Sequence, residues 1–266
     1  MTDDTAAYAN FDVAIDDGIA RVTMDSTSGQ NAITPQFAAE LTDLAIELGE
    51  DDAVRCLSLT GAGDVFGVGG DLRGWDGDDS DAVTLRSLAS TLHDAVIALH
   101  QTRKPIVAGV NGVAAGASFS LAIASDIVLV HEDATFQFSY PRIGLTGDGG
   151  STFFLPRLVG LRRAKEIALL DEPIAAEEAV DLGLATEAVP GDDFEARLEE
   201  MEQRLAAKPT TAVGWTKQLL VESFDRSLPD QLAAETDRIA RATQTDDYER
   251  GYAAFFEGTE PEFTGQ

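Results

Sequence analysis

The chain has 266 residues, of which 44% are hydrophobic and 25% charged, a composition typical of one large globular domain with a sizeable core. Its 47 acidic residues outnumber its 19 lysines and arginines, so the formal net charge is -28. This surplus argues against partners such as nucleic acid or an anionic membrane surface, because both are polyanions.

The lysine content and the N-terminus indicate the salt concentration and the cellular compartment in which the chain is expected to work. Only four cations are lysines, and at molar salt the Debye length falls to roughly 3 Å, which makes dense negative charge tolerable. We therefore expect a halophilic host. The acidic start and the lack of long apolar runs predict no signal peptide, no membrane span and a cytoplasmic location. The single cysteine, Cys56, lies in an apolar strand-like run and is expected to be a buried thiol.

Hydrophobic periodicity predicts an α/β first half. Alternating residues 11–15 and 19–24 flank an Asp-Asp-Gly turn, which is the pattern of a β-hairpin. Thr34 and Pro35 suit the N-cap and the first turn of a helix that runs to about residue 48. The other elements expected here are strands at 54–60, 105–110 and 126–130, and helices at 81–100 and 116–124.

After about residue 150 the strand pattern nearly disappears. Helices are predicted at 161–170, 175–182, 194–207, 210–222 and 229–243. Residues 258–266 are expected to be frayed or to lie on a surface. The organisation is therefore α/β first and helical last.

Two glycine-rich segments raise the possibility of nucleotide binding or hydrolysis. Residues 61–66 lack the third glycine of a dinucleotide fingerprint, and no Gly-Lys-Ser/Thr occurs. Residues 116–120 lie where a nucleophile elbow would, but serine occupies the last glycine position. The histidines at 93, 100 and 131 are expected at the surface or the core edge, and no His/Cys cluster has zinc spacing.

A different interpretation fits both segments. Residues 66–73 and 111–117 each place small residues after a predicted strand, where backbone amides can approach a ligand closely. Two such amides from different loops would form an oxyanion hole. The second loop also opens a helix, whose N-terminus favours negative charge.

The order of the motifs resembles the enoyl-CoA hydratase/isomerase (crotonase) superfamily. The similar segments are Asn31-Ala32-Ile33, 57–61, 66–73, 104–112, 125–127, 155–160 and 179–185. The resemblance implies an α/β crotonase (ClpP-like) spiral of ββα units, with the CoA and acyl site in a core at 1–200. It implies a helical oligomerisation region at 201–266, a homotrimer or homohexamer, an acyl-CoA thioester substrate, an enolate intermediate, and no metal or further cofactor.

Residue by residue, the resemblance places the two oxyanion amides at Gly70 and Ala117. Arg73 matches a position near the CoA phosphates, where a cation pairs well, although the basic residues common near the family's C-terminus are absent here. Trp75 and Phe119 are expected to line the acyl pocket or to pack in the core. The other positions expected to bind substrate are Ala32, Val68, Asp71, Leu72, Gly116, Ser120 and Tyr140.

The reaction depends on the available carboxylates. Hydratases of this family use two glutamates, whose positions fall on Ser120 and Tyr140, and neither type is a good base at neutral pH. Asp148, in a glycine turn, is the nearby carboxylate. Its surroundings resemble the branch that contains the phenylacetate-pathway epoxyphenylacetyl-CoA isomerase, also described as a Δ3,Δ2-enoyl-CoA isomerase, in which an aspartate here is the acid/base.

One carboxylate suffices for isomerisation, because the proton removed from C2 returns at C4. The favoured prediction is therefore an enoyl-CoA isomerase of fatty-acid or phenylacetate degradation, with Asp148 as acid/base. A hydratase acting on 2-enoyl-CoA and a non-catalytic CoA-binding protein of this fold remain alternatives. Asp148 as a nucleophile, as in the family's dehalogenases, or as a mere helix cap, is also open.

Overall fold

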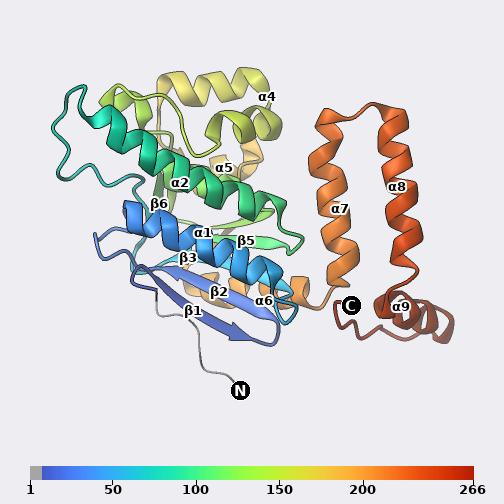
Figure 1. The fold of residues 1–266 in the computed structure, drawn as a ribbon. Coiled ribbons are helices and arrows are strands. Elements are labelled where there is room, and N and C mark those ends of the chain that lie inside the picture. The colour runs from blue at the N-terminus through green and yellow to red at the C-terminus, as the bar shows by residue number, and fades with distance from the viewer. Residues whose placement is uncertain (1–7) are drawn as a thin grey trace.

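The computed structural model describes residues 8–266, so the acidic start of the chain lies outside the described residues. A six-stranded sheet forms the centre of the N-terminal part (Figure 1). The hairpin predicted at its edge is confirmed, since the first two strands are antiparallel and the others run parallel. In spatial order the strands are β1 (Phe11–Asp16), β2 (Ile19–Met24), β3 (Cys56–Gly61), β5 (Ile106–Val110), β7 (Ile127–His131) and β10 (Glu187–Val189).

A second sheet of four short strands lies beside the first. Its order is β4 (Val65–Gly67), β6 (Val113–Ala115), β8 (Thr135–Gln137) and β9 (Ile174–Ala175). β9 and β10 correct the expectation of a purely helical second half. Strands of two or three residues are too short for alternation to reveal them.

Helices cover both faces of the large sheet. α1 (Pro35–Glu50) and α2 (Asp81–Gln101) pack on one face (Figure 1), and Thr34 caps α1 as predicted, with its Oγ1 accepting from the Phe37 amide at 3.1 Å. The short helix α3 (Ala117–Ile123) is wholly buried. On the other face, α6 (Phe194–Ala206) packs its apolar side chains around Cys56, whose predicted burial is confirmed.

The helix predicted at 161–170 is confirmed as the second part of α4 (Ser151–Leu170), which is interrupted at Gly160 by non-helical backbone with φ 75°. The first part, before Gly160, was not predicted, because Pro156 and Gly160 weaken its helical signal. α5 (Ala176–Leu182) follows. Residues 8–266 also contain three short 3-10 helices, which are η1 (Tyr140–Ile143), η2 (Gly191–Asp193) and η3 (Ser223–Asp225).

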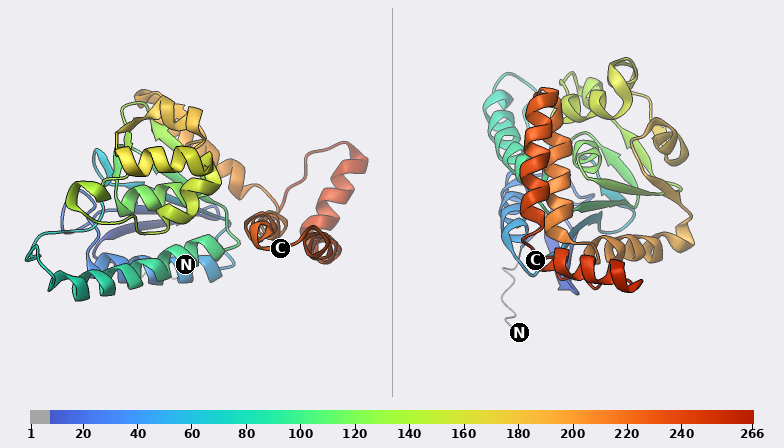
Figure 2. Two further views of the ribbon diagram at one scale, coloured as in Figure 1. Left: turned by 90° about the horizontal axis from the view of Figure 1, so that it is seen from above. Right: turned by 90° about the vertical axis from the view of Figure 1, so that its right-hand side faces the viewer.

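The C-terminal helices form an arm beside the core. α7 (Thr210–Glu222) and α8 (Leu228–Ala242) make a hairpin beside the core, which α7 contacts through an ion pair of Lys217 with Asp126 at 2.7 Å. α9 (Asp246–Glu257), which the sequence did not predict, crosses the base of this hairpin (Figures 1 and 2). The boundary predicted at residue 200 falls inside α6. Over residues 8–266, every helix is too short or too polar to cross a bilayer.

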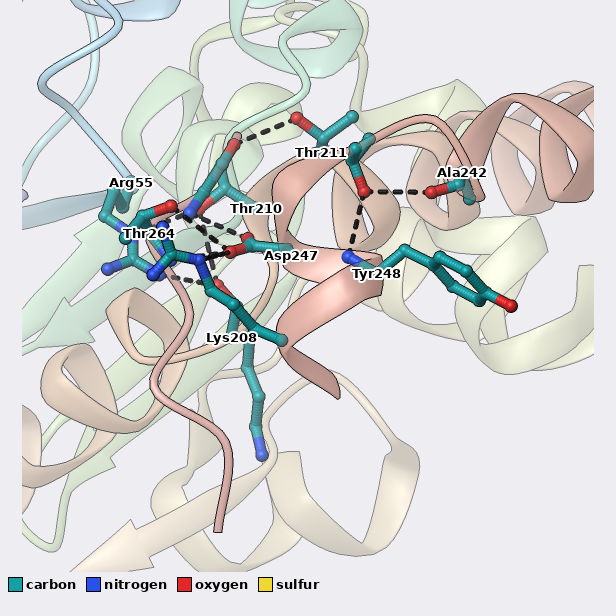
Figure 3. Close-up of polar contacts among 11 residues, drawn as sticks. Arg55, Lys208, Thr210, Thr211, Ala242, Asp247, Tyr248 and Thr264 are labelled. Carbon is teal, nitrogen blue, oxygen red and sulfur yellow. Dashed lines mark hydrogen bonds and ion pairs between the residues drawn. The ribbon is translucent and has the colours of Figure 1, made fainter. Parts of the chain in front are cut away.

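The final residues lie on the surface and are anchored there rather than frayed. The buried carboxylate of Asp247 accepts hydrogen bonds from the Thr264 and Gly265 amides, each at 2.7 Å (Figure 3). The Asp247 amide donates to the Gln266 carbonyl at 2.8 Å, and Thr211 Oγ1 donates to the Gly265 carbonyl at 2.9 Å. The tail therefore ties α9 to the start of α7.

Arg55 links the same end of the arm to the core. Its Nη2 donates to the Lys208 carbonyl at 2.9 Å, and its Nε donates to Thr210 Oγ1 at 3.3 Å (Figure 3). Because Arg55 immediately precedes β3, these bonds join the large sheet to the segment that opens the arm.

Candidate active site

A cavity of about 530 Å³ opens between the two small-residue loops, the η1 turn and the first half of α2. It brings Gly70, Ala117 and Asp148 together although they come from distant parts of the chain. Its apolar wall consists of Trp75, Leu85, Leu88, Leu92 and Leu145, among others. An apolar pocket with a few convergent polar groups is the usual form of a small-molecule site.

Within the described part of the chain, the two amides expected to form an oxyanion hole, those of Gly70 and Ala117, donate no backbone hydrogen bond. Gly70 forms an isolated parallel bridge with Ile33, in which the Ile33 amide donates to the Gly69 carbonyl (2.8 Å) and the Asp71 amide donates to the Ile33 carbonyl (2.9 Å). In this pattern the Gly70 N–H points away from the bridge. Ala117 is the first residue of α3, where amides have no acceptor within the helix.

Gly69 permits the two loops to approach each other. Its φ is +86°, and an added Cβ would lie 3.0 Å from the Ala115 carbonyl oxygen and 3.2 Å from the Ala117 nitrogen. The Gly69 amide also donates to Ser118 Oγ at 3.2 Å, which fastens the first loop to the second. The close approach of the loops that carry Gly70 and Ala117 therefore depends on a residue without a side chain at 69.

Ser120 and Tyr140 hold the backbone of Asp148. Ser120 Oγ donates to the Asp148 carbonyl oxygen at 2.9 Å, and Tyr140 Oη donates to the same oxygen at 3.1 Å. Burial raises the pKa of Tyr140 to about 12, so its hydroxyl stays a donor at neutral pH. Ser120 and Tyr140, the positions at which a hydratase is expected to carry glutamates, thus hold the turn that contains Asp148.

Among the described residues, the side chain of Asp148 has one hydrogen-bond partner, His93, which the sequence did not link to it. His93 Nε2 lies 2.6 Å from Asp148 Oδ1. His93 is 45% exposed, so its expected position at the surface or core edge is confirmed, but it also contacts the candidate site through Asp148. The helix-cap alternative for Asp148 is also wrong, because Gly150 is the N-cap of α4 and no side chain caps that end.

Only some of the residues expected around the CoA chain line the cavity. Val68, Leu72 and Gly116 line the cavity, whereas Ala32 is buried beside the bridge at Ile33. Arg73 Nε donates to Asp71 Oδ1 at 2.9 Å, and Ser28 is bonded to both side chains. Hydrogen bonds from Arg73 and Ser28 hold the pKa of Asp71 well below its usual range. Arg73 thus already has a carboxylate partner, which reduces its net attraction for a phosphate.

The aromatic and cationic residues divide between the core and the cavity. Trp75 lines the cavity, but Phe119 is fully buried against Phe136 and Phe138, so it belongs to the core. Arg86 lines the cavity and was missed, because a single arginine on a predicted helix carries no local signal. Across the described part of the chain, no group of three or more His, Cys, Asp or Glu side chains is arranged to hold a metal.

Comparison with known proteins gives a consistent result. Residues 14–266 match the enoyl-CoA hydratase/isomerase family. A Rhodobacter capsulatus protein described as a probable enoyl-CoA hydratase is 36% identical and covers 98% of this chain and 100% of its own length. The 1,2-epoxyphenylacetyl-CoA isomerase of Escherichia coli is 32% identical, with coverages of 95% and 97%.

A solved structure extends the likeness to the fold. The crystal structure of an enoyl-CoA hydratase from Polaromonas sp. JS666 has a TM-score of 0.89 and 29% identity, and covers 95% of this chain and 99% of that one. The expected crotonase fold is thereby confirmed. The chain belongs to the enoyl-CoA hydratase/isomerase family.

Proposed function

We propose that this acyl-CoA enzyme is an enoyl-CoA isomerase that moves a double bond with a single carboxylate. The observation that carries the proposal is the lining of the cavity. Among residues 8–266, Asp148 is the one carboxylate that lines it, and Gly70 and Ala117 line the same space. The positions of the paired glutamates hold Ser120 and Tyr140, which are bonded to the Asp148 backbone instead.

The chemistry follows from these groups. Asp148 removes a proton from C2 of a 3-enoyl thioester, and the electron pair moves into the thioester carbonyl to give a dienolate. The Gly70 and Ala117 amides donate to its oxygen, where one such donor typically lowers a barrier by about 2.7–4 kcal/mol. The protonated Asp148 then delivers the proton to C4, the electrons return, and the product is the 2-enoyl thioester.

Hydration of a 2-enoyl thioester is the second candidate, favoured by the contact between His93 and Asp148. Two titratable side chains 2.6 Å apart provide an acid/base pair. In that reaction one group would activate water for attack on C3, and the other would protonate C2. Both reactions use the same oxyanion amides.

Asp148→Asn tests the role of the carboxylate. We expect isomerisation of a 3-enoyl-CoA to fall by roughly 10²- to 10⁴-fold, the usual contribution of a general acid/base, while the affinity for CoA is kept. Asp133→Asn, in an exposed turn, is the control. Hydration of crotonyl-CoA is assayed in parallel, at high salt because of the net charge of -28. Unchanged isomerisation in Asp148→Asn would remove this residue from the mechanism, and hydration without isomerisation would select the second candidate.

The surface of the arm supports a homotrimer or homohexamer. Aromatic side chains of α9 are largely exposed, with Phe255 at 78% and Phe256 at 69%. Exposed apolar residues also occur on α7, on α8 and between them, at Leu220, Phe224, Leu228, Leu232 and Ile239. Extended apolar surface on a water-soluble chain usually marks a contact with another protein. We propose that copies of this chain provide the contact.

A further inference from the structure

His93 is the feature of the site that the proposed reaction leaves unexplained. It lies on α2, one turn after Ala89, which lines the cavity, and its ring contacts the Asp148 carboxylate. The exposed fractions of the two side chains are 45% for His93 and 29% for Asp148. The Nε2–Oδ1 distance of 2.6 Å is that of a short hydrogen bond.

Only the backbone of Asp148 is fixed by other groups. Its carbonyl oxygen accepts from Ser120 Oγ, from Tyr140 Oη and from the Ser151 amide. These bonds determine where the turn lies, but they leave the carboxylate free to rotate about its side-chain bonds. Among the described residues, His93 is the one hydrogen-bond partner of that carboxylate.

We propose that His93 is a positioning residue that selects the catalytic oxygen of Asp148, an inference that rests on the acid/base role proposed for that aspartate. The ionised carboxylate is an acceptor only, so Nε2 is the donor to Oδ1. Oδ2 is left to accept the proton from C2. When Oδ2 is protonated, Oδ1 remains an acceptor, so the same bond persists through both proton transfers.

This arrangement has an isotopic consequence. With one oxygen occupied and the other directed at the substrate, the proton taken from C2 is the one delivered to C4. Without the bond from His93, the carboxylate turns and meets solvent, because it is already partly exposed. Its proton then exchanges with water before delivery. Loss of position therefore appears as deuterium at C4 when the reaction is run in D2O.

The test compares variants that keep or remove the donor. His93→Phe has a similar size without a donor, and His93→Gln retains an amide N–H. We expect the kcat of His93→Phe for 3-enoyl-CoA isomerisation to fall roughly 10- to 100-fold, the scale of a small misplacement of a reacting group, with KM almost unchanged. Deuterium at C4 should rise in His93→Phe and stay near the wild-type level in His93→Gln.

Controls separate positioning from folding. His100, seven residues along α2, packs edge-on against Phe153 and Phe154, so His100→Gln should retain wild-type kcat and isotope content. In an Asp148→Asn background, His93→Phe should cause no further loss, because groups that act as a unit are not additive. His93→Asn, which keeps a polar side chain too short to reach the carboxylate, replaces His93→Phe if the latter fails to fold.

Each result has one meaning. If both donor-loss variants keep wild-type kcat and isotope content while Asp148→Asn is inactive, His93 has no positioning role and the proposed function stands. If Asp148→Asn is as active as the wild type, the proposed function falls and the role of His93 falls with it.

Discussion

Gly69→Ala is the sharpest perturbation of the two loops that carry the Gly70 and Ala117 amides. The new methyl group would lie 3.0 Å from the Ala115 carbonyl oxygen and 3.2 Å from the Ala117 nitrogen. Both neighbours are backbone atoms and cannot rotate away as a flexible side chain would. The loops must therefore separate by a few tenths of an ångström or more, which moves the Gly70 amide relative to that of Ala117.

The expected effect of Gly69→Ala has two parts, one on stability and one on kcat. The left-handed backbone conformation at residue 69 costs a residue with a side chain about 1–2 kcal/mol of stability. Loss of one oxyanion donor raises the activation barrier by about 2.7–4 kcal/mol, which is a fall of about 10²- to 10³-fold in kcat. We expect Gly69→Ala to combine a modestly lower free energy of unfolding with a kcat reduced by that factor.

Gly74→Ala provides the matched control. Gly74 lies in the same loop region with φ +84°, but an added Cβ there meets no atom within 4 Å. This variant should therefore lose similar stability and keep its kcat. The assay is 3-enoyl-CoA isomerisation at saturating substrate, with urea unfolding measured in parallel. Equal kcat values in Gly69→Ala and Gly74→Ala would refute the claim that loop contact at residue 69 sets the oxyanion geometry.

Two further predictions concern pH and assembly. Burial raises the pKa of Tyr140 to about 12, so the folded state holds its proton where an unfolded tyrosine, near pKa 10, releases it. The resulting stabilisation is complete below pH 10, and the free energy of unfolding should fall by about 2–3 kcal/mol more between pH 10 and 12 in the wild type than in Tyr140→Phe. Chemical unfolding measured across this range checks the difference, and parallel curves would contradict it. Replacing Phe255 and Phe256 with Glu should convert the proposed homotrimer or homohexamer to monomers in light scattering, whereas Val83→Glu, similarly exposed on α2, should leave the mass of the assembly unchanged.

Elements with a strong local signal could be predicted from the sequence. The β1–β2 hairpin has alternation around a turn, and α1 has a cap and a proline at its start. The two- and three-residue strands of the second sheet could not be found, because their pairing is decided by distant partners. α9 was missed because Gly251 and consecutive aromatics weaken its helical pattern.

The candidate site was also predictable only in part from the sequence. Small residues after strands pointed to the two loops, the family resemblance placed the two amides at Gly70 and Ala117, and the cavity brings these residues together with Asp148. The contact between His93 and Asp148 joins residues 55 positions apart. Nothing near either residue in the sequence indicates that α2 passes over the glycine turn. Such a pair emerges only when the helix and the turn are placed in space.

The anchoring of the tail by Asp247 makes the last three residues part of the structure of the arm. Limited carboxypeptidase digestion that removed them would leave a buried carboxylate without the two amides that satisfy it. Arg250, whose Nε lies 4.0 Å from Asp247 Oδ1, would remain as its partner. A buried charge that loses hydrogen bonds is costly, so the base of the arm would loosen although the sheets were untouched. Trimming of a few surface residues would then disturb assembly before it disturbed the cavity.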